Sequence, residues 1–193
     1  MRNICVYCGS SPGADPLFVA GAKALGKVIA ETDRVLVYGG AKVGLMGALA
    51  DSALAAGGKV IGVVPRALAE KNVAHEALTE LHVVSSMHER KAMMAQLADA
   101  FIAMPGGLGT IEEFFEMWTW AQLGIHQKPL GLFGRQDFFA PLLEFLDKLV
   151  SQRFLRSEHR QMAMFEENPL LLLRLLEGYK AVSLAKWIDR KDV

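Results

Sequence analysis

The sequence predicts an α/β fold, a Rossmann-like doubly wound and mainly parallel sheet with helices on both faces. Short runs rich in β-branched and aromatic residues alternate with helical stretches, and this alternation is typical of βαβ units. Several of these runs are continuously apolar, as expected for strands that helices cover on both faces. The predicted strands are Asn3–Tyr7, Val35–Tyr38, Val60–Val64, Leu81–Val84, Ala100–Ala103 and Leu130–Phe133.

The intervening helices carry their own start and stop signals. Three starts pair a capping residue with its usual partner: Asp15 with Pro16, Ser86 with Glu89, and Thr110 with Glu113. We expect Gly57-Gly58 to end a helix that begins near Leu45, and Asp137 to cap a helix that runs to about Val150. A short apolar run near 162–165 has no assigned type, and a leucine-rich helix is expected from Pro169 to about Glu177.

Length and composition favour one globular domain over residues 1–193. The chain has a mass of 21.1 kDa and is 52% hydrophobic, which is enough apolar material for a large core. Lys plus Arg and Asp plus Glu each number 21, so no net charge draws the chain to nucleic acid or to an anionic membrane. No segment has the roughly 18 consecutive apolar residues of a membrane span. We therefore expect a cytoplasmic protein.

Neither the cysteines nor the histidines predict a metal site. Cys5 and Cys8 lie in or just after the first predicted strand, where their spacing points the side chains to opposite faces of the sheet. The five histidines show no ligand spacing of the H-x-x-x-H kind. We expect no bound metal and no disulfide between these cysteines.

Glycine-rich loops follow several predicted strands, at the sheet edge where ligands bind in this fold class. They cover residues 9–11, 39–47 and 105–110, and a fourth loop with Arg90 and Lys91 follows the strand that ends at Val84. Glycine amides and helix amino ends suit a phosphate, although glycines also serve tight turns. The loops match neither the G-x-G-x-x-G pattern nor a P-loop, so neither NAD binding nor ATP hydrolysis is favoured.

Three charged residues in these segments have both a functional and a structural interpretation. Arg90 and Lys91 lie in the first turns of a helix, where the helix dipole disfavours a cation unless an anion or carboxylate lies opposite. Alternatively, they form an exposed pair on a solvated helix face. Glu113 is either a catalytic carboxylate or only part of a capping box. We predict that Glu113→Gln keeps a near-native melting temperature and loses activity.

Three motifs, in order and at the right separation, resemble the signatures of the LOG family, the cytokinin riboside 5′-monophosphate phosphoribohydrolases. They are Tyr38-Gly39-Gly40 through Gly47, then Met87-His88-Glu89-Arg90-Lys91, and then Pro105-Gly106-Gly107-Leu108-Gly109-Thr110-Ile111-Glu112-Glu113. The match continues through Trp118 to Gly124 and covers roughly residues 3–165.

The resemblance implies a hydrolase without cofactor or metal that splits a nucleoside 5′-monophosphate, AMP or N6-modified AMP, into free base and ribose 5-phosphate. It assigns catalysis to Arg90 and Glu113, and leaves open whether Arg90 clamps the phosphate or positions the base and the carboxylate. It assigns substrate binding to Lys91, Pro105, Gly106, Gly107, Gly109, Thr110, Gly39, Gly40 and Thr119. Thr119, between two tryptophans, has an equally plausible structural role, and Met46 either lines the base pocket or packs in the core.

Two other functions compete with this one. Family members are often labelled lysine decarboxylases, but nothing in the sequence shows a Schiff-base lysine with a partner for the pyridinium nitrogen. A nucleotide-binding or carrier protein would use the same phosphate loops without turnover. It would not need both Arg90 and Glu113, because a carboxylate close to a phosphate dianion weakens binding.

The helix expected from Ile111 to Leu123 is apolar around most of its circumference. Such a helix is either wholly internal or shared between two subunits. The resemblance, in which homodimers are usual, favours the second, so we expect a homodimer.

Overall fold

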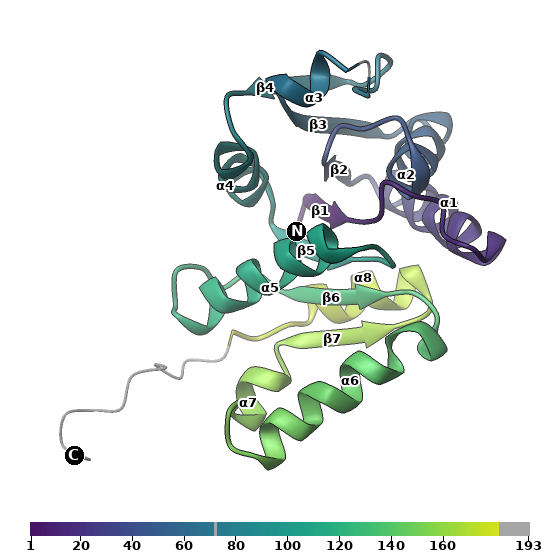
Figure 1. Cartoon of the computed structure of the whole chain (residues 1–193). Coiled ribbons are helices and arrows are strands. Elements are labelled where there is room, and N and C mark those ends of the chain that lie inside the picture. The colour runs from purple at the N-terminus through teal and green to yellow at the C-terminus, as the bar shows by residue number, and fades with distance from the viewer. Residues whose placement is uncertain (72, 182–193) are drawn as a thin grey trace.

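The computed structural model describes residues 1–71 and 73–181, so residues 72 and 182–193 of the expected domain lie outside the described part. Within it, parallel strands form one sheet in the order β4-β3-β2-β1-β5-β6-β7 (Figure 1). The strands are β1 Asn3–Tyr7, β2 Val35–Tyr38, β3 Lys59–Pro65, β4 Glu80–Val84, β5 Ala100–Ala103, β6 Leu130–Phe133 and β7 Ala163–Glu166. Because the strands are parallel, their carboxyl ends meet at one edge of the sheet.

Helices cover both faces of this sheet (Figure 1). They are α1 Pro16–Glu31, α2 Gly44–Ala55, α3 Arg66–Ala69, α4 Met87–Leu97, α5 Leu108–Gln122, α6 Gln136–Ser151, α7 Ser157–Arg160 and α8 Pro169–Glu177. Side chains of α4, α5 and α6 pack into one half of the core, and side chains of α1, α2 and α8 pack into the other half. The predicted doubly wound α/β fold is confirmed.

All six predicted strands form, four of them with the predicted bounds. Strands β2, β5 and β6 are buried at every residue, which explains their continuous apolar character. The apolar run without an assigned type becomes β7, which pairs with β6 in the register Leu130 with Ala163. The residues of β7 after Ala163 are only half-buried. An apolar run this short, without alternating polar residues, does not distinguish a strand from a helix, so the type of this segment could not be assigned from the sequence.

Two of the predicted capping residues stand where the sequence placed them. The Asp15 carboxylate accepts from the Leu17 amide at 2.8 Å and begins α1. The Ser86 hydroxyl accepts from the Glu89 amide at 3.1 Å and begins α4. The Glu89 carboxylate, however, accepts from the amide of Ser85 at 2.8 Å, so the second half of the expected capping box is displaced by one residue.

Two other predicted caps are wrong. Helix α5 begins at Leu108 with Gly107 at its N-cap, so Thr110 lies inside the first turn and Glu113 caps nothing. Helix α6 begins at Gln136 with Arg135 at its N-cap, and Asp137 lies in its first turn, where it accepts from Arg135 Nε at 2.9 Å. Both carboxylates pair with an arginine, Glu113 with Arg90 and Asp137 with Arg135.

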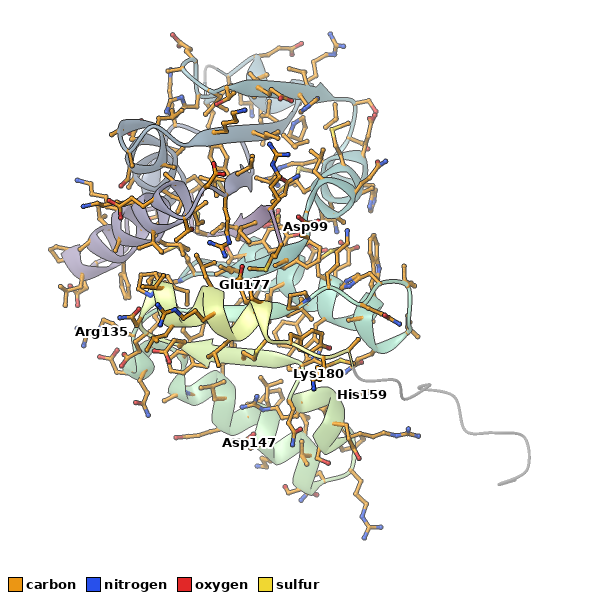
Figure 2. The ribbon with its side chains drawn as sticks, turned by 180° about the vertical axis from the view of Figure 1, so that it is seen from behind. Asp99, Arg135, Asp147, His159, Glu177 and Lys180 are labelled. Atoms are coloured by element: carbon orange, nitrogen blue, oxygen red, sulfur yellow. The ribbon has the colours of Figure 1, made fainter. Side chains whose placement is uncertain are left out.

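Three acidic residues at or near the ends of helices or strands, Asp99, Asp147 and Glu177, make polar contacts with neighbouring segments; Figure 2 labels all three. Glu177 of α8 pairs with Arg34, which precedes β2, and Asp147 of α6 accepts from Arg160 Nε of α7 at 2.8 Å. At the amino edge of the sheet, Asp99 accepts from the Asn3 amide at 2.8 Å. These contacts lie away from the carboxyl edge and leave it open.

The two cysteines occupy opposite faces of the sheet, as predicted. Cys5 packs in the half of the core below α4 and α5, and Cys8 packs in the half below α1 and α2. Both are buried free thiols. Among the helices that the structure describes, none is long and apolar enough to cross a membrane.

Candidate active site

A pocket of about 340 Å³ opens at the carboxyl edge of the sheet, between the loop after β1, the start of α4 and the start of α5. Predicted site residues that line it are Arg90, Gly107, Gly109, Thr110 and Glu113. The pocket therefore collects the catalytic candidates and most of the expected phosphate turn in one place.

Backbone hydrogen bonds join the loops around this pocket. The Gly9 amide donates to the Pro105 carbonyl at 3.1 Å, and the Leu45 amide donates to the Gly9 carbonyl at 3.1 Å. Gly44 has a φ of 60°, and a side chain there would overlap the backbone of Ser10. The loops after β1, β2 and β5 thus pack against one another, as expected for neighbouring parallel strands.

The amino end of α5 forms one wall of the pocket. No side chain among the described residues caps this end, because Gly107 occupies the N-cap position. Open space surrounds Gly107 and Gly109 where a side chain would lie, whereas Gly106 packs against the Thr110 side chain and the Gly9 amide. Uncapped first-turn amides and the positive end of the helix dipole suit a phosphate.

Arg90 of α4 and Glu113 of α5 form a buried ion pair in the same pocket. Arg90 Nη1 lies 2.8 Å from Glu113 Oε1, and each residue is 5% exposed. Arg90 Nε donates to the Val63 carbonyl at 3.1 Å. The cation predicted to need a carboxylate opposite it has one, and the exposed-pair interpretation of Arg90 and Lys91 is wrong.

Burial and charge act in opposite directions on Glu113. Burial raises the pKa of its carboxyl above the usual 4.5, and the Arg90 guanidinium partly opposes that rise. Burial likewise raises the pKa of the Cys8 thiol, which also lines the pocket, so Cys8 is protonated and not a nucleophile at neutral pH. Glu113 is the group in this cluster whose protonation the site can tune.

Lys91 does not line the pocket. Its Nζ lies 2.5 Å from the Glu112 carboxylate and 3.2 Å from Glu116 Oε1, both on α5. Burial disfavours the ammonium charge, but these carboxylates outweigh burial and raise the pKa of Lys91. The structure thus makes Lys91 a tie between α4 and α5, beside the Arg90–Glu113 pair.

Five other predicted binding residues also lie off the pocket wall, and Gly106, which packs against Thr110 and Gly9, is one of them. Gly40 has a φ of 76°, which favours glycine, and its carbonyl accepts from the His75 amide at 2.9 Å. Gly39 stands against the Arg90 guanidinium. Pro105 supports the turn through its carbonyl. Thr119 is exposed on α5, beyond the residues that line the pocket.

Several lining residues were not among the predicted site residues. Cys8, Gly9, Ser10, Met46, Met87, Leu108 and Glu112 complete the wall. Met46 was weighed as a base-pocket residue and does face the pocket. For Met87 and Leu108, position at the start of a helix that follows a strand was the only available signal, because their side chains carry no distinctive chemistry.

Comparison with known proteins agrees with the motifs. The family model described as "Possible lysine decarboxylase" matches residues 46–176. The chain is 46% identical over 178 residues to the cytokinin riboside 5′-monophosphate phosphoribohydrolase LOG of Oryza sativa subsp. japonica, covering 92% of this chain and 74% of that protein. It is 48% identical over 155 residues to a protein of the same name from Rhodococcoides fascians, covering 80% and 78%.

The decarboxylase description of the family model implies pyridoxal phosphate, which needs a lysine with a neutral amine. Among the described residues that line the pocket there is no lysine. Lys91, next to Arg90, is held as a cation by two carboxylates. The residues present therefore do not fit that cofactor.

Solved structures share the fold. A molybdenum cofactor binding protein from Rippkaea orientalis superposes with a TM-score of 0.68 at 23% identity, covering 92% of this chain and 97% of that one. The Moco carrier protein from Chlamydomonas reinhardtii gives a TM-score of 0.68 at 21% identity, covering 92% and 98%. At these identities the likeness concerns the fold alone. With the family model, the relatives above 40% identity and the three motifs in agreement, the chain belongs to the LOG family.

Proposed function

We propose that this chain is an N-glycosyl hydrolase that cleaves AMP or N6-modified AMP into free base and ribose 5-phosphate. The observation that carries the proposal is the buried Arg90–Glu113 pair, which faces the same pocket as the uncapped amino end of α5. Binding a phosphate alone requires no carboxylate, and a carboxylate in the same pocket repels a dianion. A role of Glu113 in cleaving the bond between sugar and base would explain why a carboxylate lies beside an anion site.

The 5′-phosphate would bind at the start of α5. The amides of Gly107, Gly109 and Thr110 and the Thr110 hydroxyl are suited to its oxygens. The helix dipole adds about 0.3 to 1 kcal/mol at an exposed site, and up to about 2 kcal/mol in a partly buried one. Since this binding energy also orients the sugar, nucleosides without the phosphate should be poor substrates.

Glu113 would act on the ribose. In hydrolysis a water oxygen forms a bond to C1′, the bond from C1′ to the base nitrogen breaks, and the base leaves with the electron pair and takes up a proton. Positive charge develops on the sugar in the transition state, and a nearby carboxylate stabilises that charge or orients the water. Arg90 keeps this carboxylate oriented and opposes its protonation.

The test is to incubate the purified protein with AMP, N6-isopentenyl-AMP, GMP and CMP, and to follow free base and ribose 5-phosphate by chromatography. We expect base release from the adenine nucleotides and little from adenosine. The competing function, a nucleotide-binding or carrier protein, predicts tight nucleotide binding without any base release. If the protein binds all four nucleotides and releases no base from any of them, the carrier function is favoured.

We also propose that the enzyme is a homodimer that acts in the cytoplasm. Leu108 and Ile111 of α5 and Leu123 at its C-cap are 87%, 44% and 39% exposed, and such apolar residues along one helix are suited to a subunit contact. Both cysteines are free thiols, which is usual in a reducing compartment. Light scattering and cell fractionation test the two statements separately.

A further inference from the structure

Two hydrogen bonds hold the Arg90 guanidinium, and its third nitrogen lies against Gly39. Its Nε donates to the Val63 carbonyl of β3 at 3.1 Å, and its Nη1 donates to Glu113 at 2.8 Å. Its Nη2 stands in the space where a side chain at position 39 would begin. A buried arginine held in this way cannot swing to follow a ligand without breaking one of these contacts.

The backbone at Gly39 does not explain why a glycine stands there. Its φ lies outside the left-handed region, unlike that of Gly40, which is 76°. Any residue could adopt the Gly39 conformation, so the requirement comes from space. A Cβ at this position would overlap Arg90 Nη2. It would also lie 3.4 Å from Met46 Sδ, so the added methyl group has little room to move away from Arg90 on that side.

We propose that Gly39 is a positioning residue: the missing side chain leaves the room in which the Arg90 guanidinium stands, and Arg90 in turn holds the Glu113 carboxylate. The inference deepens the proposed function and rests on it for its catalytic consequence. Within this arrangement Arg90 holds the carboxylate through Nη1, while its Nε is occupied by the Val63 carbonyl of the sheet.

A displaced Arg90 changes the charge balance around Glu113. The charged groups that face this carboxylate are Arg90 and Lys91 on α4 and Glu112 on α5. The titratable groups near it on and just after β1 are Cys5, Tyr7 and Cys8. Burial raises the pKa of all three of these groups, so they are neutral at neutral pH and cannot replace Arg90. Moving the guanidinium away therefore leaves the burial of Glu113 less opposed.

The first experiment needs no substrate. The Glu113 carboxyl is titrated by ¹³C NMR in the wild type, in Gly39→Ala and in Gly21→Ala. Gly21 is a matched control in α1, because a Cβ there meets only Phe133 at 3.8 Å, an ordinary contact. We expect a higher pKa for Glu113 in Gly39→Ala than in the other two proteins. An unchanged pKa, together with an unmoved guanidinium in a crystal structure of Gly39→Ala, would overturn the inference.

The second experiment measures kinetics with the best nucleotide. Gly39→Ala should lower kcat by about 100-fold, as a misplaced catalytic group does, with only a small change in KM, because the phosphate turn is untouched. The acid limb of the pH profile should move to higher pH. A rise in KM at unchanged kcat would instead assign Gly39 to ground-state binding and contradict the inference.

A double-mutant cycle separates the clash from any other effect of the alanine. Lysine at position 90 lacks Nη2, so Gly39→Ala should add little to the loss of activity or of melting temperature already caused by Arg90→Lys. If Gly39→Ala fails to fold, the double variant should recover folding. Additive losses, or failure of both proteins to fold, would contradict the inference. Base release by no protein, the wild type included, would contradict the proposed function, whereas the NMR titration would still decide the role of Gly39.

Discussion

Burying Arg90 or Glu113 alone would cost more free energy than burying the two as a pair. Removing a charge from water costs several kcal/mol, which only a close partner of opposite charge and further hydrogen bonds repay. Arg90 has both kinds of contact, since the Val63 carbonyl takes one donor and Glu113 another. The raised pKa of Glu113 indicates that pairing repays only part of the cost of burying its carboxylate. This imbalance leads to three predictions about single residues.

Glu113→Gln should abolish base release and leave the melting temperature near that of the wild type. The glutamine keeps an acceptor for Arg90, and the lost charge pairing is offset by the removed cost of burying a carboxylate. The expected stability is the one that the capping interpretation gave, but the reason differs, since Glu113 caps nothing. Calorimetry and the chromatographic assay measure both effects. Glu31→Gln, in an exposed pair with Lys27, serves as the control.

Arg90→Met should be far more harmful to the fold than Glu113→Gln. It leaves a buried carboxylate without its cation and the Val63 carbonyl without its donor. Leaving a buried charge without a hydrogen-bond partner of its own costs about 3 to 5 kcal/mol, whereas in Glu113→Gln the Arg90 guanidinium still donates to the glutamine oxygen and to the Val63 carbonyl. Urea denaturation of the two variants side by side checks this asymmetry, and equal stabilities would contradict it.

The stability of the protein should also depend on the ionisation of Glu113. Because burial raises its folded pKa above 4.5, the folded state binds this proton more readily than the unfolded chain does. The free energy of unfolding should therefore fall, relative to that of Glu113→Gln, as pH rises from 4.5 through the folded pKa. Subtracting the variant's profile removes the carboxyls whose pKa is lowered in the fold, such as Asp99, which act in the opposite direction. A flat difference between the two profiles would rule this effect out.

Three ion pairs connect helices α4 and α5. The Arg90–Glu113 pair is buried, and Lys91 binds the Glu112 and Glu116 carboxylates beside it. Two adjacent residues of α4 thus reach three positions on α5. The contact fixes where the start of α5, with the proposed phosphate turn and Glu113 one turn further along, lies relative to Arg90 of α4.

Lys91→Met tests whether Lys91 acts as such a tie or as a substrate ligand. As a tie, its loss should lower stability by about 1 to 3 kcal/mol, the range for a disrupted hydrogen bond to a charged group, with little change in KM for AMP. Lys27→Met removes a comparable pair that is largely exposed and should change stability by less than about 1 kcal/mol. A large rise in KM with unchanged stability would restore the binding role.

Helix α5 has apolar residues both on its buried side and on its exposed side. Phe114, Met117 and Trp118 are buried against the sheet, whereas Ile111 and Leu123 remain exposed. The helix is therefore not wholly internal, and the subunit contact stays a prediction that the oligomeric state tests. The site opens beside this exposed side, so assembly and catalysis would share one helix.

Ile111→Asp should convert the proposed dimer to a monomer. A charge at the centre of an apolar subunit contact is buried without a partner and opposes association. Size exclusion with light scattering should give twice 21.1 kDa for the wild type and 21.1 kDa for the variant. Phe154→Asp, at an 83% exposed position after α6, is the control and should keep the wild-type mass. A wild-type mass of 21.1 kDa would reject the dimer itself.

The sequence by itself determined the order of strands and helices, the glycine turns at the carboxyl edge and the identity of the catalytic candidates, because these depend on local periodicity and on motifs of fixed spacing. It could not decide between the capping and the catalytic interpretations of Glu113, nor place Lys91 or Gly39. Those questions concern residues 20 to 50 positions apart, and only packing of α4, α5 and β3 brings them into contact. Tertiary structure excluded the cap at Glu113 and placed Lys91 and Gly39, because burial and the distance between charges, which set the energies involved, exist only once the chain has folded.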